Sequence, residues 1–225
     1  MRFLFLLFLL IIASCSNKKK LEKSINTVHK TKNLIATLDT IRWTEQTPIS
    51  LRDSLINIYG AESKEADLYQ KEYRKNHKIN IIKIKRILDT YGWPKNELIG
   101  NQGNMTIANV LQHADQETRE HYIPLMKQAV LDKKLEPRYL VRAKDRIATD
   151  KGHLQIYGGQ MKYYPKTKSF NVWPVFNPIN LDKRRAKIGL EPITEFLKNR
   201  FDFEWNLEEQ IKRSEEFEKE RLLNK

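Results

Sequence analysis

Cysteine is almost absent from this sequence. Cys15 is the only one, so the 225-residue chain has no cysteine pair for an internal disulfide or for a metal site. Glycine and proline occur eight times each, too rarely for a linker-rich or low-complexity protein. The sequence also lacks H-E-x-x-H, G-x-S-x-G and P-loop motifs, and its five histidines show no metal-ligand spacing. We therefore expect no metal and no cofactor.

Long hydrophobic runs are missing too. Residues 3–12 are apolar, but a membrane-spanning helix needs roughly 20 such residues. This run follows Arg2 and leads into small residues, which is the order of a secretory signal peptide. Its end, Ile12-Ala13-Ser14-Cys15, resembles the bacterial lipobox, in which the cysteine is lipidated and becomes the mature N-terminus. The alternative is a plain secretion signal with an incidental cysteine.

The lipobox interpretation predicts a lipoprotein of the cell envelope. Residues 1–14 would be the signal peptide, and Cys15 would carry the lipid, including palmitate, as a membrane anchor. Ser16, in place of Asp, resembles the pattern of lipoproteins sent to the outer membrane. We therefore predict a protein anchored there and facing the periplasm or the cell surface, with the membrane as its partner through the N-terminal lipid.

Acidic residues are too few to balance the basic ones. The chain has 28 acidic and 41 basic residues, a net charge of +13. Such an excess can indicate nucleic acid, anionic lipid or an acidic glycan. The basic residues are spread along the chain and interleaved with Asp and Glu, which favours a solvated surface, and the leader argues against a nucleic-acid partner. The composition predicts no particular oligomeric state.

The rest of the chain is mainly helical in pattern. Residues 15–47 are rich in Lys, Asn and Thr, which predicts a flexible stalk after the lipidated cysteine. In residues 48–205 apolar side chains recur at helical spacing, with Asp115 as an N-cap and Pro137 at a first helical position. Residues 206–225 predict a charged C-terminal helix. We expect one mainly helical domain.

A β-hairpin interrupts the helical pattern. In residues 154–164 and 169–175 β-forming residues alternate with polar ones, and the segment between them is rich in turn residues. We therefore predict that a hairpin spanning residues 154–175 is appended to the helical domain.

Three polar residues fall at one predicted helix junction: Gln112, His113 and Asp115. His113 is the natural candidate for general acid–base catalysis, since imidazole titrates nearest neutral pH. Gln112 and Asp115 are candidates for ligand binding. The alternative is that Asp115 only caps the next helix and that His113 is a buried histidine with one hydrogen bond.

The hairpin carries a second polar group. If Leu154 and Ile156 face the core, Gln155 and Tyr157 face the opposite way. A bulge at the two following glycines would bring Gln160 to the same surface. Two amides and a phenol suit a neutral polar ligand such as a sugar or a peptide backbone. The alternative is a glycine-kinked strand whose amides bind loop backbone.

Two arginines complete the candidates. Arg184 and Arg185 lie in the first turn of a predicted short helix, where cations oppose the helix dipole. At least one should be held by a carboxylate or an anionic ligand. Asp145 is the candidate internal partner, and we interpret Asp145 and Arg146 as structural rather than ligand-binding.

Several motifs together resemble a bacterial domain-of-unknown-function family, number 6624 in that series, over about residues 65–197. The family's usual Y-G-T-Q has threonine where this chain has Gly159, so the hydroxyl is missing here. The resemblance implies no established activity. It implies that the polar residues belong to one shared site. The motifs are Trp93-Pro94 with Gly100, Gln112-His113-Ala114-Asp115, Asp145-Arg146, Gln155-Ile156-Tyr157-Gly158-Gly159-Gln160, Arg184-Arg185-Ala186 and Gly189-Leu190-Glu191-Pro192.

Three functions are compatible with these residues. The first is a module that binds a small polar extracytoplasmic ligand, a glycan or a peptide, in a cleft where the hairpin, the residue 112–115 junction and the two arginines converge. The second is a hydrolase or lyase in which His113 is the acid–base and Tyr157 acts beside it. The third is a structural envelope protein with a buried polar network.

Overall fold

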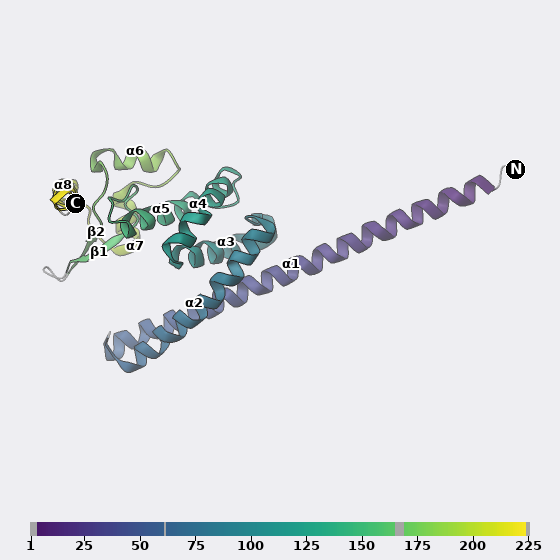
Figure 1. The fold of residues 1–225 in the computed structure, drawn as a ribbon, viewed down its shortest axis with the longest axis horizontal. Coiled ribbons are helices and arrows are strands. Elements are labelled where there is room, and N and C mark those ends of the chain that lie inside the picture. Colours follow the sequence, from purple (N-terminus) through teal and green to yellow (C-terminus); the bar gives the residue numbers. More distant parts are fainter. Residues whose placement is uncertain (1–3, 61, 165–168, 224–225) are drawn as a thin grey trace. The chain divides into compact units, whose positions relative to one another are not determined.

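The computed structural model describes residues 4–60, 62–164 and 169–223. In these residues it contains eight α-helices and one two-stranded antiparallel sheet (Figure 1). This confirms a mainly helical fold with a minor β-hairpin. The chain divides into two compact units, where the sequence predicts a single domain. The first unit comprises Met1–His77 and Lys95–Thr106, and the second comprises Lys78–Pro94 and Ile107–Lys225.

The first unit is built on a helical hairpin. Helix α1 (Leu4–Tyr59) is followed by α2 (Lys64–Tyr91), and their side chains meet in antiparallel order. Arg52 donates to Gln70 over 2.6 Å, and farther along Asn76 donates to the carbonyl of Thr44 over 3.1 Å. His77 lies 3.1 Å from the carboxylate of Glu45. These contacts join the second half of α1 to the first half of α2.

Helix α1 contains the segment that the sequence predicts to be a stalk. Residues 16–47 are helical, and Leu38 and Ile41 are fully buried. Their burial makes this part of α1 core rather than tether, and Pro48 lies inside the helix rather than at its start. Residues 1–3 of the predicted signal peptide lie outside the described residues. Among the helices that are described, none combines the length and apolarity needed to cross a bilayer.

Helices α4 (Gln116–Leu131) and α5 (Pro137–Asp150) pack together in the second unit. The predicted N-cap is confirmed, because the Asp115 carboxylate accepts from the Thr118 amide over 2.7 Å. Pro137 opens α5, as predicted. Helix α3 (Asn96–His113) precedes them and is interrupted at Gly100, where φ is +65°.

The β-hairpin is shorter than predicted. Strand β1 (Met161–Tyr164) pairs with β2 (Ser169–Val172), with Met161 opposite Val172. Residues 154–160 are not a strand, and Gln155 forms only an isolated bridge to Val175. The alternation argument therefore fails here, since the segment is folded into a loop by side-chain hydrogen bonds described below. The predicted turn, residues 165–168, lies outside the described residues.

The rest of the second unit covers this hairpin. A 3₁₀ turn (Pro178–Asn180) leads into α6 (Leu181–Ala186) and α7 (Ile193–Phe201). Asp182 lies in the first turn of α6, but its carboxylate accepts from the Ile193 amide over 2.7 Å and so caps α7, because the turn after α6 brings the start of α7 back to it. A buried apolar cluster joins these elements: Val172, Val175, Leu181, Ile193 and Leu197.

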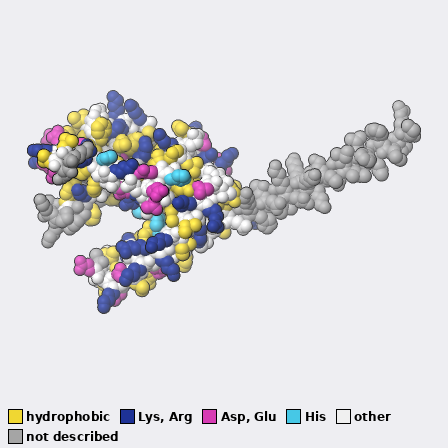
Figure 2. Space-filling model, in the orientation of Figure 1, with side chains coloured by type: hydrophobic (Ala, Val, Ile, Leu, Met, Phe, Trp, Pro, Cys, Tyr) yellow, Lys and Arg dark blue, Asp and Glu magenta, His cyan; other side chains and the backbone are white. Residues whose placement is uncertain are grey.

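The charged C-terminal segment is part of this unit. Helix α8 (Leu207–Leu223) confirms the predicted helix, and the Asn206 side chain caps it by accepting from the Glu209 amide. Two of its polar residues are buried: Ser214 accepts from the Val175 amide over 3.0 Å, and Gln210 is fully enclosed. On the face shown in Figure 2, basic side chains are interspersed with acidic and apolar ones.

Candidate functional site

The loop of residues 155–160, which we call the 155–160 loop, is organised around one carboxylate. Asp145 projects from α5 and is fully buried. One of its oxygens accepts from the amides of Ile156 and Tyr157, over 2.8 and 2.9 Å, and the other accepts from Gly159 over 2.8 Å. A carboxylate that binds three backbone N–H groups fixes their conformation. Asp145 is therefore the structural centre of the loop.

Burial dominates the electrostatics of Asp145. Loss of hydration raises the pKa of its carboxyl to about 6, while the three N–H donors and the positive charge of Arg185 act in the opposite direction. The folded chain therefore binds this proton more tightly than the unfolded chain does. The stabilisation that comes from this tighter proton binding is fully present below the ordinary pKa of 3.8 and is lost as pH rises through about 6, while the hydrogen bonds between the carboxylate and the loop remain.

The pH dependence of stability tests this assignment. We expect the advantage of the wild type over Asp145→Asn in free energy of unfolding to be larger at pH 4.5 than at pH 7. Between these two pH values the advantage should change by about 2 kcal/mol, since pH 4.5 lies about 1.5 units below the folded pKa and one unit corresponds to about 1.4 kcal/mol. Urea unfolding at both pH values measures it. An advantage that is larger at pH 7 would mean that the three N–H donors outweigh the loss of hydration.

Gln155 also holds the loop from within. Its side-chain oxygen accepts from the Gln160 amide over 2.8 Å, and its side-chain nitrogen donates to the carbonyls of Gln160 and Trp173, over 3.1 and 2.8 Å. The residue is fully buried. The prediction that it shares an open surface with Tyr157 is wrong, because these bonds turn its amide into the loop. The arrangement corresponds to the alternative in which the amide binds loop backbone.

Arg184 and Arg185 hold the carbonyl side of the same loop. Arg184 donates to the carbonyl of Ile156 over 3.1 Å and also to those of Phe176 and Asn177. Arg185, only 2% exposed, donates to the carbonyls of Tyr157 and Glu191, each over 2.7 Å. Both arginines donate to carbonyl groups, whereas the prediction named a carboxylate or an anionic ligand.

The predicted Arg–Asp partnership is indirect. The carbonyl of Tyr157 accepts a hydrogen bond from Arg185, and the N–H of Tyr157 donates one to Asp145. One stretch of backbone therefore separates the buried cation from the buried anion. Arg146, the other member of the predicted structural pair, faces elsewhere.

Gly158 is the position of the loop that requires glycine. Its φ is +78°, and a Cβ there would lie 2.8 Å from Cδ1 of Ile193, a buried core residue. We expect Gly158→Ala to lower the free energy of unfolding by about 2–4 kcal/mol, through backbone strain and overpacking together. Gly152→Ala is the control, since its φ of +67° adds strain but its Cβ would meet nothing within 4 Å. Equal losses in the two variants, measured by urea unfolding, would contradict the packing argument.

His113 belongs to a separate group of side chains. Arg146 lies with its Nη1 3.1 Å from Nδ1 of His113 and 3.5 Å from the carbonyl of Gln112. Because a guanidinium only donates, Nδ1 of His113 acts as the acceptor in this contact. His113 is exposed, not buried. Successive residues of a helix project about 100° apart, so Arg146 and Asp145 leave α5 in different directions.

Tyr157 belongs to the 155–160 loop. Its ring is half-buried and has the Lys144 ammonium 5.8 Å from its centre, and burial raises the pKa of its phenol. Gln160 donates weakly to the carbonyl of Arg142 over 3.4 Å. The contacts described for the predicted site residues thus form two groups: those of Tyr157, Gln155, Gln160 and the two arginines at the loop, and those of Gln112, His113 and Asp115 at the junction.

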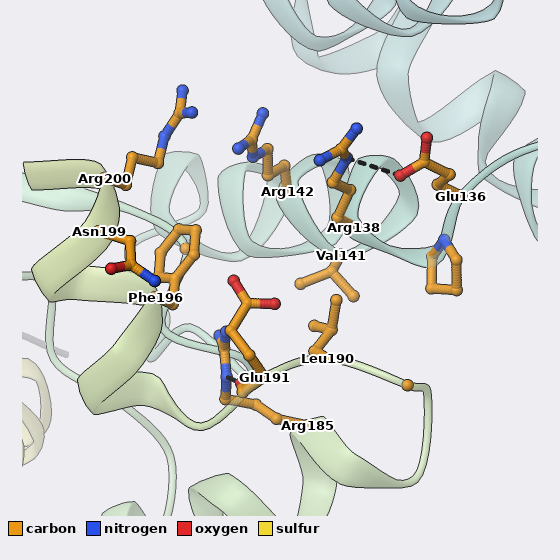
Figure 3. Close-up of a pocket in the computed structure, with 13 residues that line it drawn as sticks. Glu136, Arg138, Val141, Arg142, Arg185, Leu190, Glu191, Phe196, Asn199 and Arg200 are labelled. Atoms are coloured by element: carbon orange, nitrogen blue, oxygen red, sulfur yellow. Dashed lines mark hydrogen bonds and ion pairs between the residues drawn. The ribbon is translucent and has the colours of Figure 1, made fainter. Parts of the chain in front are cut away.

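A pocket of about 500 Å³ lies beside the loop, between α5, residues 189–191 and α7 (Figure 3). Of the predicted residues it includes Arg185, together with Gly159 of the loop. Gln112, His113, Asp115 and Tyr157 are not among its lining residues. Its other lining residues are Glu136, Pro137, Arg138, Val141, Arg142, Gly189, Leu190, Glu191, Phe196, Asn199 and Arg200.

Three arginines of this pocket, Arg138, Arg142 and Arg200, were not among the predicted site residues. Arg138, Arg142 and Asp145 follow one another at spacings of four and three, so they share one side of α5. That spacing was a usable signal. Arg200 offered none, because its position depends on how α7 packs. Burial lowers the pKa of Arg142, and the neighbouring charges of Arg200 and Arg138 act in the same direction.

Comparison with known proteins gives one result. No curated protein and no solved structure matches the chain significantly. A family model does match, over residues 51–205, which extends beyond both ends of the resemblance seen in the sequence. The matched region contains the 155–160 loop, Asp145, both loop arginines and the whole pocket. The chain belongs to the family of unknown function DUF6624.

Proposed function

We propose that this protein is a lipid-anchored binding module that takes a small polar extracytoplasmic ligand, a glycan or peptide fragment, in the pocket between α5 and α7. The observation that carries the proposal is the pocket itself. Its volume of about 500 Å³ is that of small-molecule sites, and it combines an apolar wall with a few charged and amide groups. Val141, Leu190 and Phe196 supply the wall.

Preorganisation also favours binding at this place. Gly159 and Arg185 belong both to the pocket lining and to the network around Asp145. Groups that are already held by hydrogen bonds lose little conformational freedom when a ligand arrives. His113, the predicted acid–base residue, is not among the lining residues. Binding therefore accounts for this pocket better than catalysis by His113.

Blocking the pocket tests the proposal. Asn199 is exposed and lies at the lining, so Asn199→Trp should fill the space without disturbing the core. Glu195→Trp is the control, since Glu195 is exposed on the same helix outside the lining.

The whole chain, in detergent, is screened by thermal shift against short peptides and oligosaccharides. We expect hits with the wild type and the control that Asn199→Trp loses. Hits retained by Asn199→Trp, or none with the wild type, would contradict the proposal.

The anchor has its own test. If Cys15 is lipidated, Cys15→Ser should prevent lipid attachment, and the protein should leave the membrane fraction or remain unprocessed. Fractionation of cells expressing the wild type and the variant, together with the mass of each purified protein, measures this. A variant with the same mass change and the same membrane fraction as the wild type would exclude the anchor.

A further inference from the structure

The pocket carries more positive charge than its own residues neutralise. Four arginines line it, against two glutamates: Arg138, Arg142, Arg185 and Arg200 with Glu136 and Glu191. Figure 3 shows the guanidinium groups of Arg138, Arg142 and Arg200 in a row along one side. The pocket therefore has an excess of two cations on its lining, concentrated on that side.

Two of the four arginines in the lining already have partners. Arg138 forms an ion pair with Glu136 over 2.9 Å. Arg185 donates to two main-chain carbonyls and lies below the row in Figure 3. For Arg142 and Arg200, by contrast, no carboxylate lies within ion-pair distance in the part of the chain that the structure describes. These two guanidinium groups are the ones left to bind a ligand.

Arg142 is held in a position that favours an anion. Its side chain is half-buried on α5, with Arg138 and Arg200 as like-charged neighbours. Glu191 acts on Arg142 in the opposite direction, but its effect on the pKa ranks below those of Arg200 and Arg138. The like charges therefore still repel each other, and an anion between them removes that repulsion. Guanidinium groups bind carboxylate and phosphate through paired N–H donors. The row is thus suited to one planar anionic group at the pocket mouth.

We propose that the ligand of this pocket carries a carboxylate, which Arg142 and Arg200 bind together. This inference rests on the proposed binding function. A carboxylate fits better than a phosphate, because Glu191 lies on the same pocket and repels a dianion more strongly than a monoanion. The apolar wall formed by Val141, Leu190 and Phe196 receives the body of an organic molecule rather than a free inorganic ion.

Matched probe pairs test the carboxylate and its source. The acids are galacturonate and N-acetyl-alanyl-alanine, and their neutral partners are galactose and N-acetyl-alanyl-alaninamide. Inorganic phosphate, at the same ionic strength, is the competing anion.

Binding to the whole chain in detergent is followed by the side-chain Nε–H signals of arginine in NMR titrations. We expect an acid to bind saturably, to shift the Arg142 and Arg200 signals, and to bind at least about tenfold more tightly than its neutral partner. The acid that binds identifies a sugar or a peptide source.

Arginine variants complete the test. Arg142→Gln and Arg200→Gln should each weaken the acid about tenfold or more. Arg86→Gln, at an exposed position of α2 outside the pocket lining, should leave binding unchanged. Circular dichroism checks folding, and exposed Arg200 keeps the test usable if Arg142→Gln unfolds.

The outcomes separate the two proposals. Equal binding of acid and neutral partner, or equal affinity in Arg142→Gln, Arg200→Gln and wild type, overturns the carboxylate inference and leaves the binding function standing. Tighter binding of phosphate than of either acid also overturns it. If no probe of either kind shifts any pocket signal, both proposals fail.

Discussion

Replacing Asp145 with alanine should lower the free energy of unfolding of the second unit by about 3–5 kcal/mol at pH 7. The change removes the acceptor of three backbone N–H groups inside the 155–160 loop. Each buried donor left without a partner costs about 1–3 kcal/mol, partly recovered if water enters. It also leaves Arg185 without the nearest buried negative charge. Urea unfolding monitored on second-unit signals measures the loss.

Asp145→Asn is the informative companion variant. An asparagine oxygen can still accept from Ile156 and Tyr157, but its NH₂ group faces the Gly159 amide, donor against donor. We expect a loss smaller than that of the alanine variant but still above about 1 kcal/mol. A control is Asp182→Asn, which affects a single amide at the start of α7. If Asp145→Asn and Asp182→Asn cost the same, the three-donor account of the loop is wrong.

Arg185→Ala should produce a loss of similar size, about 3–5 kcal/mol. Its guanidinium is buried and joins the carbonyls of Tyr157 and Glu191, and it also packs 4.9 Å from the ring centre of Phe196. Truncation leaves two carbonyls without their donors and opens a hole beside the pocket. Unfolding measurements on Arg185→Ala and on the wild type give the difference in their free energies of unfolding.

Lysine at the same position distinguishes charge from geometry. Arg185→Lys keeps the positive charge but cannot serve both carbonyls with a rigid fork, so we expect it to recover less than half of the loss. Arg184→Lys is the control, because Arg184 is itself only half-buried while Arg185 is 2% exposed, so the exchange should be tolerated better there. Full recovery by Arg185→Lys would show that charge alone is needed there.

Local signals allowed much of the helical framework to be predicted. Asp115 and Pro137 each act within a few residues of their own position, and each has its predicted role in the structure. Alternation of residue types, however, predicted a strand over residues 154–160. It failed because the Asp145 carboxylate and the Gln155 amide bind that backbone. The two-residue alternation of apolar and polar side chains carries no information about such hydrogen bonds.

The candidate site was predicted in part. Arg185 belongs to the loop network and to the pocket, as the grouping of polar motifs indicated. His113 was grouped with the loop only because both are polar, and its contact with Arg146 lies on a different side of α5. Arg200 approaches Arg142 through the packing of α7, which depends on apolar contacts of Ile193 and Leu197 rather than on any motif.

Amide hydrogen exchange tests the central role of Asp145 most directly. In the wild type, the amides of Ile156, Tyr157 and Gly159 should exchange slowly, because each donates to a buried carboxylate. In Asp145→Asn the Gly159 amide should lose its protection selectively, while amides inside α4 keep theirs. Equal Gly159 exchange rates in the two proteins would contradict the account, since the loop would then hold its shape without the carboxylate.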